Sequence, residues 1–409
     1  MKRARLVNVF SFVVVLTGCA GLIGVPDLTF DEDADQGGLD GSVTGDGSVS
    51  GDGSVTGDGG PAPPCDESKL ASDPKHCGRC GHDCLGGACS AGKCESVVVR
   101  GGLENPTDLA LDGANVYVTS RGNGAVLRIA KGDGKTDVLA SGHDEARGVA
   151  LDGQNLFWSN NDFDGDGGDD YWGGVWACTL PACTDTRLVT LGDHAVNVRF
   201  VDGFLYFGEN NNGAVVRVRP DGSMRANVGS ATKPWGVAAD GAHVYFSSNT
   251  NFLQRAPFDG GAQENVGPLE YGGVAGFVTV DDERVYWAYA EFDETTQKGH
   301  VFSALKSNPA APKEEYGAAN VGSIGVAVDA TTLYWTNEGR YDTATFENQK
   351  NGEVLACPKT GCGGAPPVVL QTGLAAPAAI AVDSEAVWFL TFGTKQGSAD
   401  GELRKIAKP

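Results

Sequence analysis

The chain has 409 residues, of which 41% are hydrophobic and 21% are charged, and its formal net charge at pH 7 is −22. Such an acidic chain repels the phosphates of nucleic acids and the anionic headgroups of a membrane surface, which argues against both as binding partners. The length is sufficient for one large domain or for an array of repeats.

The first residues have the parts of an export signal. Three basic residues lie within the first five positions, and Leu6–Leu16 form an apolar run that is too short to cross a bilayer. The run ends in the sequence LTGC, which resembles the bacterial lipobox, where cleavage precedes a cysteine that receives lipid. The resemblance implies a signal peptide over residues 1–18 and a lipid anchor at Cys19. An ordinary secretory signal with a chance cysteine is the alternative. Ala20 follows where inner-membrane retention often uses Asp, so the resemblance also implies an outer-membrane lipoprotein, on the cell surface or the periplasmic side.

Residues 19–64, which begin with the lipidated cysteine, are predicted to be a disordered tether. The units GDGSVS and GDGSVT follow each other, and no Lys or Arg occurs between Arg5 and Lys69. Gly, Ser and Asp cannot build a hydrophobic core, and the aspartates repel one another. The six-residue period also differs from the nine-residue period of calcium-binding nonapeptide repeats.

Residues 65–94 are predicted to be a small disulfide-rich segment. The chain has eleven cysteines, so ten remain if Cys19 carries lipid, an even number that suits an exported protein with disulfides. The stretch DPKHCGRCGHDCLGGACSAGKC resembles a cysteine motif found after low-complexity tethers in surface proteins of myxobacteria and their relatives. The spacing does not choose among the possible pairings of these six cysteines: Cys65, Cys77, Cys80, Cys84, Cys89 and Cys94.

Zinc is the alternative ligand for this segment, because His76, Cys77, Cys80 and His82 have ligand-like spacing. Export and the even cysteine count favour disulfides instead. The remaining four cysteines form two local pairs, Cys178 with Cys183 and Cys357 with Cys362, which share one pattern. Each pair is predicted to form a disulfide that clamps the turn of a β-hairpin.

A repeat organises everything after residue 95. In each unit an apolar strand ends at an aspartate, and an aromatic strand follows a few residues later, as in LALD…VYVT and VAVD…LYWT. The units recur about every 40 to 50 residues, which is typical of a β-propeller. We call these aspartates the anchors, and expect each to accept backbone N–H bonds in the turn between the first and second strands. The anchors are Asp112, Asp152, Asp202, Asp240, Asp281, Asp329 and Asp383.

The repeat predicts an all-β fold, a seven-bladed β-propeller over residues 95–409 with four strands in each blade. The last unit ends after its third strand, Glu402–Ile406, while Ser96–Arg100 precedes the first unit and has the pattern of a spare fourth strand. Pairing the two closes the ring in a three-plus-one arrangement and removes both exposed edges. The chain resembles the NHL and YVTN propellers at the level of the fold.

The stretch DFDGDGGDD, residues 162–170, suggests a structural calcium site between two strands of the second unit. Asp162, Asp164 and Asp166 have the spacing of the first half of an EF-hand loop. Gly173 stands where that loop needs a bidentate Glu, so Asp169 or Asp170 would have to supply the missing oxygens. Oxygen ligands suit Ca²⁺. The alternative is a solvated acidic loop without a metal.

Two functions remain open on the sequence. The favoured one is a surface-tethered binding module whose face loops contact a protein or a glycan, with Trp172, Trp235, Tyr271 and Tyr341 as aromatic contacts. Four other tryptophans lie in second strands and are predicted to be core: Trp158, Trp287, Trp335 and Trp388.

The alternative is a metal-assisted lactonase or lyase. Asn160 and Asn337 stand eight residues after their anchors, and Glu209 is at the equivalent position if one deletion is allowed in the third unit. These three residues could hold a divalent ion in a manner similar to propeller lactonases. His143 and His194 could serve as bases, as the resemblance to streptogramin lyases implies. The competing interpretation is that these side chains cap turns at strand ends.

Overall fold

The structure is a computed structural model that describes residues 65–161, 173–248, 253–266, 273–292, 297–319, 321–342, 345–362 and 364–409. The predicted signal peptide, Cys19, the predicted tether and the aspartate run lie outside the described residues, as do Trp172 and Tyr271. In the described part of the chain, no helix is long and apolar enough to cross a membrane.

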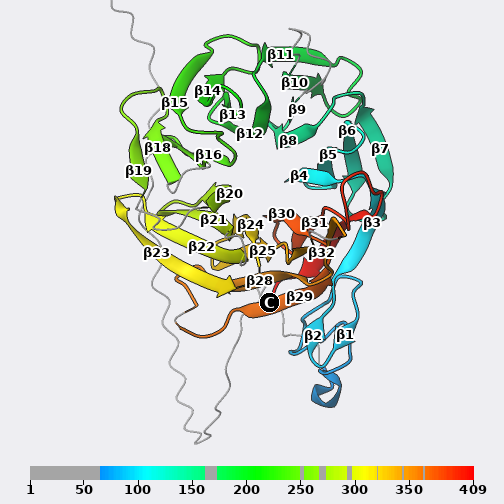
Figure 1. The fold of residues 1–409 in the computed structure, drawn as a ribbon. Coiled ribbons are helices and arrows are strands. Elements are labelled where there is room, and N and C mark those ends of the chain that lie inside the picture. Colours follow the sequence, from blue (N-terminus) through cyan, green and yellow to red (C-terminus); the bar gives the residue numbers. More distant parts are fainter. Residues whose placement is uncertain are drawn as a thin grey trace, which may run out of the picture. The chain divides into compact units, whose positions relative to one another are not determined.

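Seven four-stranded antiparallel sheets are arranged around a central axis, which confirms the predicted seven-bladed β-propeller (Figure 1). Each sheet is one blade, and we number the blades by their repeat units. Blades 1 to 3 consist of β4 (Pro106–Leu111), β5 (Asn115–Ser120), β6 (Ala125–Ala130) and β7 (Thr136–Ala140); β8 (Ala146–Leu151), β9 (Asn155–Asn160), β10 (Gly174–Thr179) and β11 (Arg187–Leu191); β12 (Ala195–Val201), β13 (Phe204–Glu209), β14 (Ala214–Val218) and β15 (Ala226–Ser230).

The other four blades follow the same meander. Blades 4 and 5 consist of β16 (Val237–Ala239), β17 (His243–Phe246), β18 (Leu253–Pro257) and β19 (Glu264–Val266); β20 (Gly273–Val280), β21 (Arg284–Phe292), β22 (Gln297–Leu305) and β23 (Asn308–Ala319). Blades 6 and 7 consist of β24 (Ser323–Val328), β25 (Thr332–Asn337), β28 (Gly352–Pro358) and β29 (Val368–Leu374); β30 (Pro377–Val382), β31 (Ala386–Thr391), β32 (Gly401–Ala407) and β3 (Val97–Leu103). A short hairpin of β26 (Tyr341–Asp342) and β27 (Glu347–Asn348) extends from blade 6.

The ring is closed as the sequence predicts. The first strand of every blade lies innermost and contacts the first strand of the next, from β4 through β8, β12, β16, β20, β24 and β30 back to β4. In blade 7, β3 from the start of the repeat region pairs with β32 at the end of the chain, with Val97 opposite Lys405. Since both ends of the repeat array are paired, the propeller has no open blade.

The anchor aspartates have the predicted structural role. Asp112 Oδ1 accepts hydrogen bonds from the N–H groups of Ala114 and Asn115, at 2.7 and 2.6 Å. Equivalent pairs of bonds occur at Asp152, Asp240, Asp281, Asp329 and Asp383. Asp202 is different because its unit is one residue shorter. There Asp202 and Gly203 both have positive φ, 49° and 78°, as a two-residue type I′ hairpin turn requires.

Four anchors also join neighbouring blades through lysines that follow third strands. The pairs are Lys131 with Asp383, Lys306 with Asp240, Lys359 with Asp281, and Lys408 with Asp329, at 2.6 to 3.2 Å. Partial burial alone would raise the pKa of Asp329, but the N–H bonds and Lys408 outweigh it and lower that pKa to about 2. These four anchors are therefore ionised at neutral pH and fasten one blade to the next.

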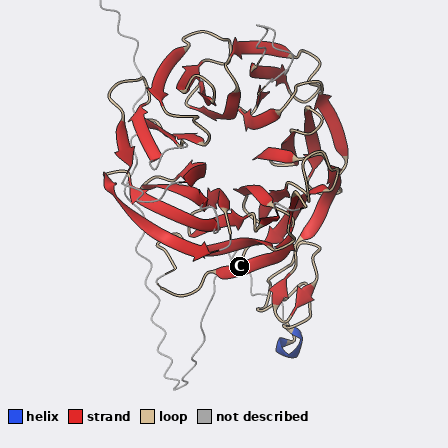
Figure 2. Ribbon diagram, in the orientation of Figure 1, coloured by secondary structure: helices blue, strands red, loops and turns tan. Residues whose placement is uncertain are grey.

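The aromatic second strands build the core between blades. Trp158, Trp287 and Trp335 are fully buried and Trp388 is nearly so, which confirms the prediction that these four tryptophans are core residues. Large rings on successive blades fill the wedge-shaped space between two sheets. Figure 2 shows how completely strands dominate the architecture: η1 (Glu67–Lys69) is the one helical element in the described part of the chain.

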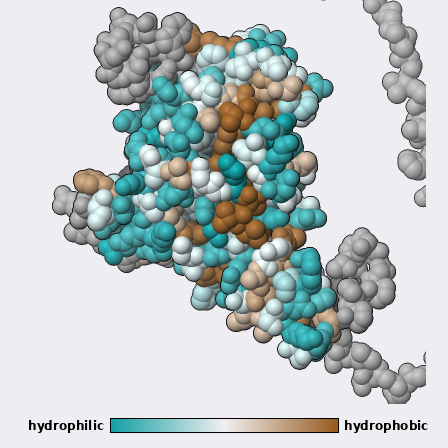
Figure 3. All heavy atoms as spheres, turned by 90° about the vertical axis from the view of Figure 1, so that its right-hand side faces the viewer, coloured by the Kyte–Doolittle hydropathy of each residue, from teal (hydrophilic) through white to brown (hydrophobic). Residues whose placement is uncertain are grey.

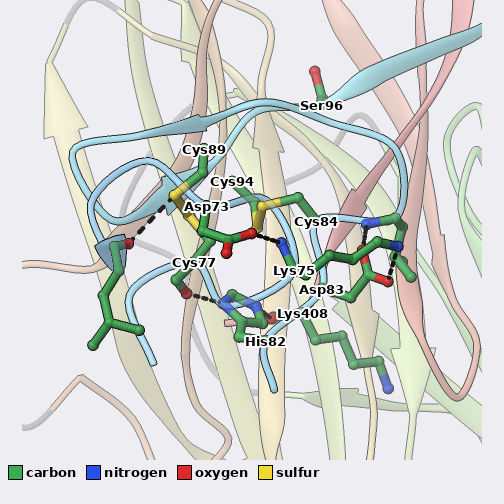
Figure 4. Close-up of a disulfide and its surroundings, with 12 residues drawn as sticks. Asp73, Lys75, Cys77, His82, Asp83, Cys84, Cys89, Cys94, Ser96 and Lys408 are labelled. Atoms are coloured by element: carbon green, nitrogen blue, oxygen red, sulfur yellow. Dashed lines mark hydrogen bonds and ion pairs between the residues drawn. A yellow bond between two sulfur atoms is a disulfide. The ribbon is translucent and has the colours of Figure 1, made fainter. Parts of the chain in front are cut away.

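The cysteine-rich segment, which we call the knob (residues 65–94), contains three disulfides and a two-stranded sheet of β1 (Cys89–Ser90) and β2 (Lys93–Cys94). The pairs are Cys65–Cys80, Cys77–Cys89 and Cys84–Cys94, of which Figure 4 shows the last two. The disulfide prediction is thus confirmed, and the pairing that the spacing left open is resolved. Cys77 and Cys80 belong to different disulfides, so their sulfurs are not available as zinc ligands.

The knob packs against the closing strand of the propeller. Its buried cysteines form one apolar cluster with Ala407 of β32. His82 lies between two carbonyl oxygens, with Nδ1 2.6 Å from Cys77 O and Nε2 2.8 Å from Lys408 O (Figure 4). The knob therefore covers the place where the ring is closed.

Both hairpin disulfides form as predicted. Cys178 at the end of β10 bonds Cys183 in the following turn, and Cys357 near the end of β28 bonds Cys362. Figure 3 views the side of the ring that carries β3 and β7, where apolar side chains gather at the surface. Val98 and Val138 are exposed on these outer strands.

Candidate functional site

A cavity of about 510 Å³ lies where the first strands begin, and we call it the mouth cavity. All seven residues that stand five positions before an anchor line it, one from each blade. This convergence is what a ring of identical units produces, because equivalent positions meet at the axis. The seven residues are Thr107, Arg147, Asn197, Trp235, Gly276, Ile324 and Ala378.

β-bulges help to turn these side chains toward the axis. The strand register shifts close to this position in the first strands of all blades except blade 4, for example between Ala146 and Gly148 and between Ser323 and Val326. A bulge adds one residue to a strand and re-aims a side chain. The sequence pattern of the repeat does not change at the bulge. The direction that the bulge gives to the side chains is therefore visible only in the structure.

A glycine and a hydroxyl hold the blades together just below the mouth. Thr336 Oγ1 accepts the N–H of Gly325 at 2.9 Å and donates to the carbonyl of Ala378 in the next blade at 2.7 Å. Ser247 makes the same bridge from blade 4 to blade 5, at 2.7 and 3.0 Å. These hydrogen bonds hold in place the first residues of the inner strands, which line the cavity.

The wall from blades 1 to 4 is cationic. Arg147 Nη2 lies 2.7 Å from Glu145 Oε2, and Arg121 Nε donates to Glu145 Oε1 at 2.9 Å. The guanidinium of Arg147 also lies over the ring of Trp235, with Cζ 5.1 Å from the centroid. Lys233 is exposed and lines the same cavity. The two arginines thus share one carboxylate, and Lys233 adds a third positive charge, which leaves this wall positive.

Two buried polar atoms on this wall have no protein partner among the described residues, Arg147 Nε and Asn197 Oδ1. The first is a donor and the second is an acceptor. Asn197 is only 5% exposed and has a φ of 53°, so its backbone conformation is one that asparagine tolerates better than most residues. A buried polar group without a partner costs free energy unless a ligand or water completes it.

The opposite wall, from blades 5 to 7, is apolar apart from one acid. Phe277, Ile324, Ala378 and Phe392 line it together with Glu338. Glu338 Oε1 accepts a hydrogen bond from Gln297 Nε2 at 3.0 Å. Burial raises the pKa of Glu338 to about 7, and the bond from Gln297 opposes that shift only partly. The cavity therefore has one positive, hydrogen-bonding side and one apolar side.

A second cavity of about 410 Å³ continues below the mouth, lined by the inner strands. Phe277 lines both cavities. In the lower one, Arg199 Nη1 lies 2.6 Å from Asp108 Oδ2, in a pair that bridges blades 3 and 1. This ion pair is satisfied within the protein and gives the channel a structural cross-link.

The three predicted ligands of a divalent ion are not among the residues that line the mouth cavity. Asn160 Oδ1 accepts from the N–H of Gly174 and from Trp176 Nε1. Glu209 accepts from Arg225 at 2.6 Å, and Asn337 bonds Tyr316 and Ser323. The residues at this repeat position, eight after the anchor or seven in the shorter third unit, are at most 3% exposed in all seven units. Their contacts fit the competing interpretation, in which they satisfy strand ends.

The two predicted bases also lie away from the described cavity lining. His143 packs edge-on against Trp158 and Trp176, and burial lowers its pKa. His194 Nδ1 lies 2.9 Å from Asp193 Oδ1. Among the predicted aromatic contacts, Trp235 lines the mouth cavity, and Tyr341 is 51% exposed on β26. The structure thus brings Trp235 to the site and does not bring the histidines there.

Sequence reasoning missed most of the cavity lining. Arg147, Asn197 and Trp235 stand at the same repeat position, where the seven units carry seven different residue types. A strand position whose residue type changes from unit to unit, while its neighbours stay apolar, indicates a surface where the blades meet at the axis. Aligning the seven units on their anchors would have revealed this position. Arg121, Asn210, Glu338 and Phe392 share a second repeat position, directly after the second strand, which the same alignment would also have found.

No model of a known protein family matches the sequence, and no curated protein matches it either. Among solved structures, the WD40 β-propeller domain of Doa1 is similar, with a TM-score of 0.54 at 12% identity, over 77% of this chain and 96% of that chain. The GH74 enzyme of Niastella koreensis is similar over 74% of this chain and 53% of that chain, with a TM-score of 0.57 at 13% identity. These similarities show that the protein shares the β-propeller fold with both.

Proposed function

We propose that the protein is a surface-tethered binding module, held at the outer membrane by lipid on Cys19, and that the mouth cavity is its primary binding site for a protein or a glycan. One observation carries the proposal: seven equivalent positions converge on one cavity, and their chemistry differs from blade to blade. A concave, largely apolar site with a few polar groups is the usual form of a ligand pocket. Arg147 Nε and Asn197 Oδ1, which are buried and have no hydrogen-bond partner among the described residues, belong to residues that line that cavity.

Filling the mouth is expected to abolish ligand binding without unfolding the propeller. Ala378→Trp places a large ring at a lining position, and Val138→Trp, on the outer strand β7, is the matched control. The full chain, purified in detergent, would be applied to glycan and peptide arrays, and thermal unfolding would check the fold. Loss of bound array signals in Ala378→Trp alone supports the mouth as the site. Equal signals from both variants and the native chain would contradict it.

Lipid attachment at Cys19 is expected to depend on that single sulfur. Cells expressing the native chain and Cys19→Ser would be labelled with a fatty-acid analogue and then fractionated. The native chain should carry the label and sediment with the outer membrane, because acyl chains supply the anchor. An unlabelled native chain, or a labelled Cys19→Ser chain, would contradict the proposed anchor.

Calcium binding at the aspartate run stays a prediction. Calorimetric titration of Ca²⁺ into the chelator-treated full chain is expected to show saturable binding that disappears in Asp164→Ala/Asp166→Ala, because these carboxylates supply hard oxygen ligands. A native chain that binds no calcium, or a variant that binds it equally well, would contradict the site.

A further inference from the structure

We propose that the mouth cavity takes the carboxylate end of an acidic sugar, a hexuronate unit, an inference that rests on the proposed binding function and names its ligand class. Four observations lead to it: the charge of one wall, the geometry of its free donor, the free acceptor beside it, and the apolar wall opposite.

The charge of the cavity is opposite to that of the chain. The protein carries a net charge of −22, yet Arg121, Arg147 and Lys233 line the mouth cavity, with Glu145 as the carboxylate that both arginines contact. A local positive field in an acidic protein concentrates anions at that point and repels them elsewhere. The expected ligand is therefore an anion.

The arrangement of donors favours a carboxylate over a sulfate or a phosphate. Arg147 uses Nη2 for Glu145 and keeps its buried Nε without a partner in the described structure. A guanidinium edge matches a planar carboxylate. A sulfate or phosphate has more acceptor oxygens, and the apolar opposite wall offers them few donors. A carboxylate leaves fewer oxygens to satisfy.

The free acceptor requires a donor close to the carboxylate. Asn197 Oδ1 is buried and lacks a partner among the described residues, and Asn197 lines the same cavity as Arg147. A ligand hydroxyl would complete this acceptor. In a hexuronate, ring hydroxyls lie near the carboxylate, so one unit can address Arg147 and Asn197 together.

The opposite wall suits the face of a pyranose ring. Phe277, Ile324 and Phe392 form it, and Trp235 lies beside Arg147. A pyranose carries donors around its edge and C–H groups on its faces, so it matches a cavity with polar groups on one side and aromatic rings on the other. An acidic peptide would share the carboxylate but lacks this apolar ring face.

The test is calorimetric titration of digalacturonate into the full chain purified in detergent. The native chain is expected to bind it, and Arg147→Met to weaken binding at least tenfold, because a charge-assisted hydrogen bond is lost. Arg100→Met, which replaces an exposed arginine on β3, is the matched control and should bind as the native chain does. Asn197→Asp keeps a residue type that tolerates positive φ and adds a charge that repels the ligand, so it should also lose binding, and thermal unfolding checks that the variant remains folded.

Two further arms separate failure of this inference from failure of the proposed function. A neutral galactose disaccharide that binds as well as digalacturonate, and does so through the mouth because Ala378→Trp abolishes it, would overturn the acidic-sugar inference and leave the binding function standing. An acidic dipeptide that binds through Arg147 while digalacturonate does not would overturn it as well. Absence of any digalacturonate binding to a folded native chain would overturn it directly.

Discussion

Gly325→Ala is expected to destabilise the propeller by about 3 kcal/mol, as overpacking at a rigid contact does. A Cβ at this position would collide with the carbonyl oxygen of Ala378 in the next blade, and it would also crowd Thr336 Oγ1. Both partners belong to the inter-blade bridge described above. Because the obstacle is a backbone atom of a paired strand, no side-chain rotation can relieve it. Urea unfolding of the full chain measures the loss.

Gly113→Ala is the matched control for that experiment. Gly113 lies in the turn after the anchor Asp112, and a Cβ there would meet no atom within 4 Å. Its stability should stay within about 0.5 kcal/mol of the native chain, as at most surface positions. Equal effects at the two glycines would show that the close approach of blades 6 and 7 does not contribute as described.

Glu338→Gln is expected to stabilise the protein at pH 8 by about 2 kcal/mol and to have little effect near pH 4. Burial raises the pKa of Glu338 to about 7, well above its ordinary value of 4.5. The unfolded chain therefore loses this proton at lower pH than the folded chain does, so stability falls as pH rises from about 4.5 to about 7. The side-chain amide of the variant does not ionise, so stability no longer falls over this pH range. Its oxygen can still accept the hydrogen bond from Gln297.

Chemical unfolding at several pH values measures this effect, with Glu67→Gln as the control. Glu67 is exposed in η1, so its replacement should change stability equally little at every pH. A pH-independent effect of Glu338→Gln would contradict the buried, proton-holding carboxyl. If Glu338→Gln stabilises the protein at pH 8 and not at pH 4, ionised Glu338 lowers the stability of the fold. Groups with such shifted pKa values are characteristic of functional sites.

The fold could be predicted from the sequence because the same strand pattern occurs seven times in the chain. The anchors and the aromatic second strands recur in every unit. The extra strand at Val97–Leu103 supplies the fourth strand that the last unit lacks after β32. The hairpin disulfides were predictable for the same reason, since Cys178 and Cys357 share one local pattern. The pairing in the knob was not, because the six cysteines lie too close together for spacing to choose among the pairings.

The site was less predictable, because the direction of a side chain depends on details that the repeat does not record. The last residues of the second strands, such as Asn160 and Asn337, were expected at the mouth, yet these side chains are buried and hydrogen-bonded to neighbouring strands. Bulges in most of the first strands help to bring residues such as Arg147 to the axis instead. The raised pKa of Glu338 arises from its burial in the folded chain, which no local pattern encodes.

The most direct test of the account is a crystal structure of the full chain, purified in detergent and soaked with digalacturonate. The account predicts ligand density in the mouth cavity, with a carboxylate at Arg147 and a sugar hydroxyl at Asn197. Ligand density on the outer strands, or an empty mouth in crystals of a chain that binds the sugar in solution, would contradict the claim that the first strands of the seven blades build the binding site.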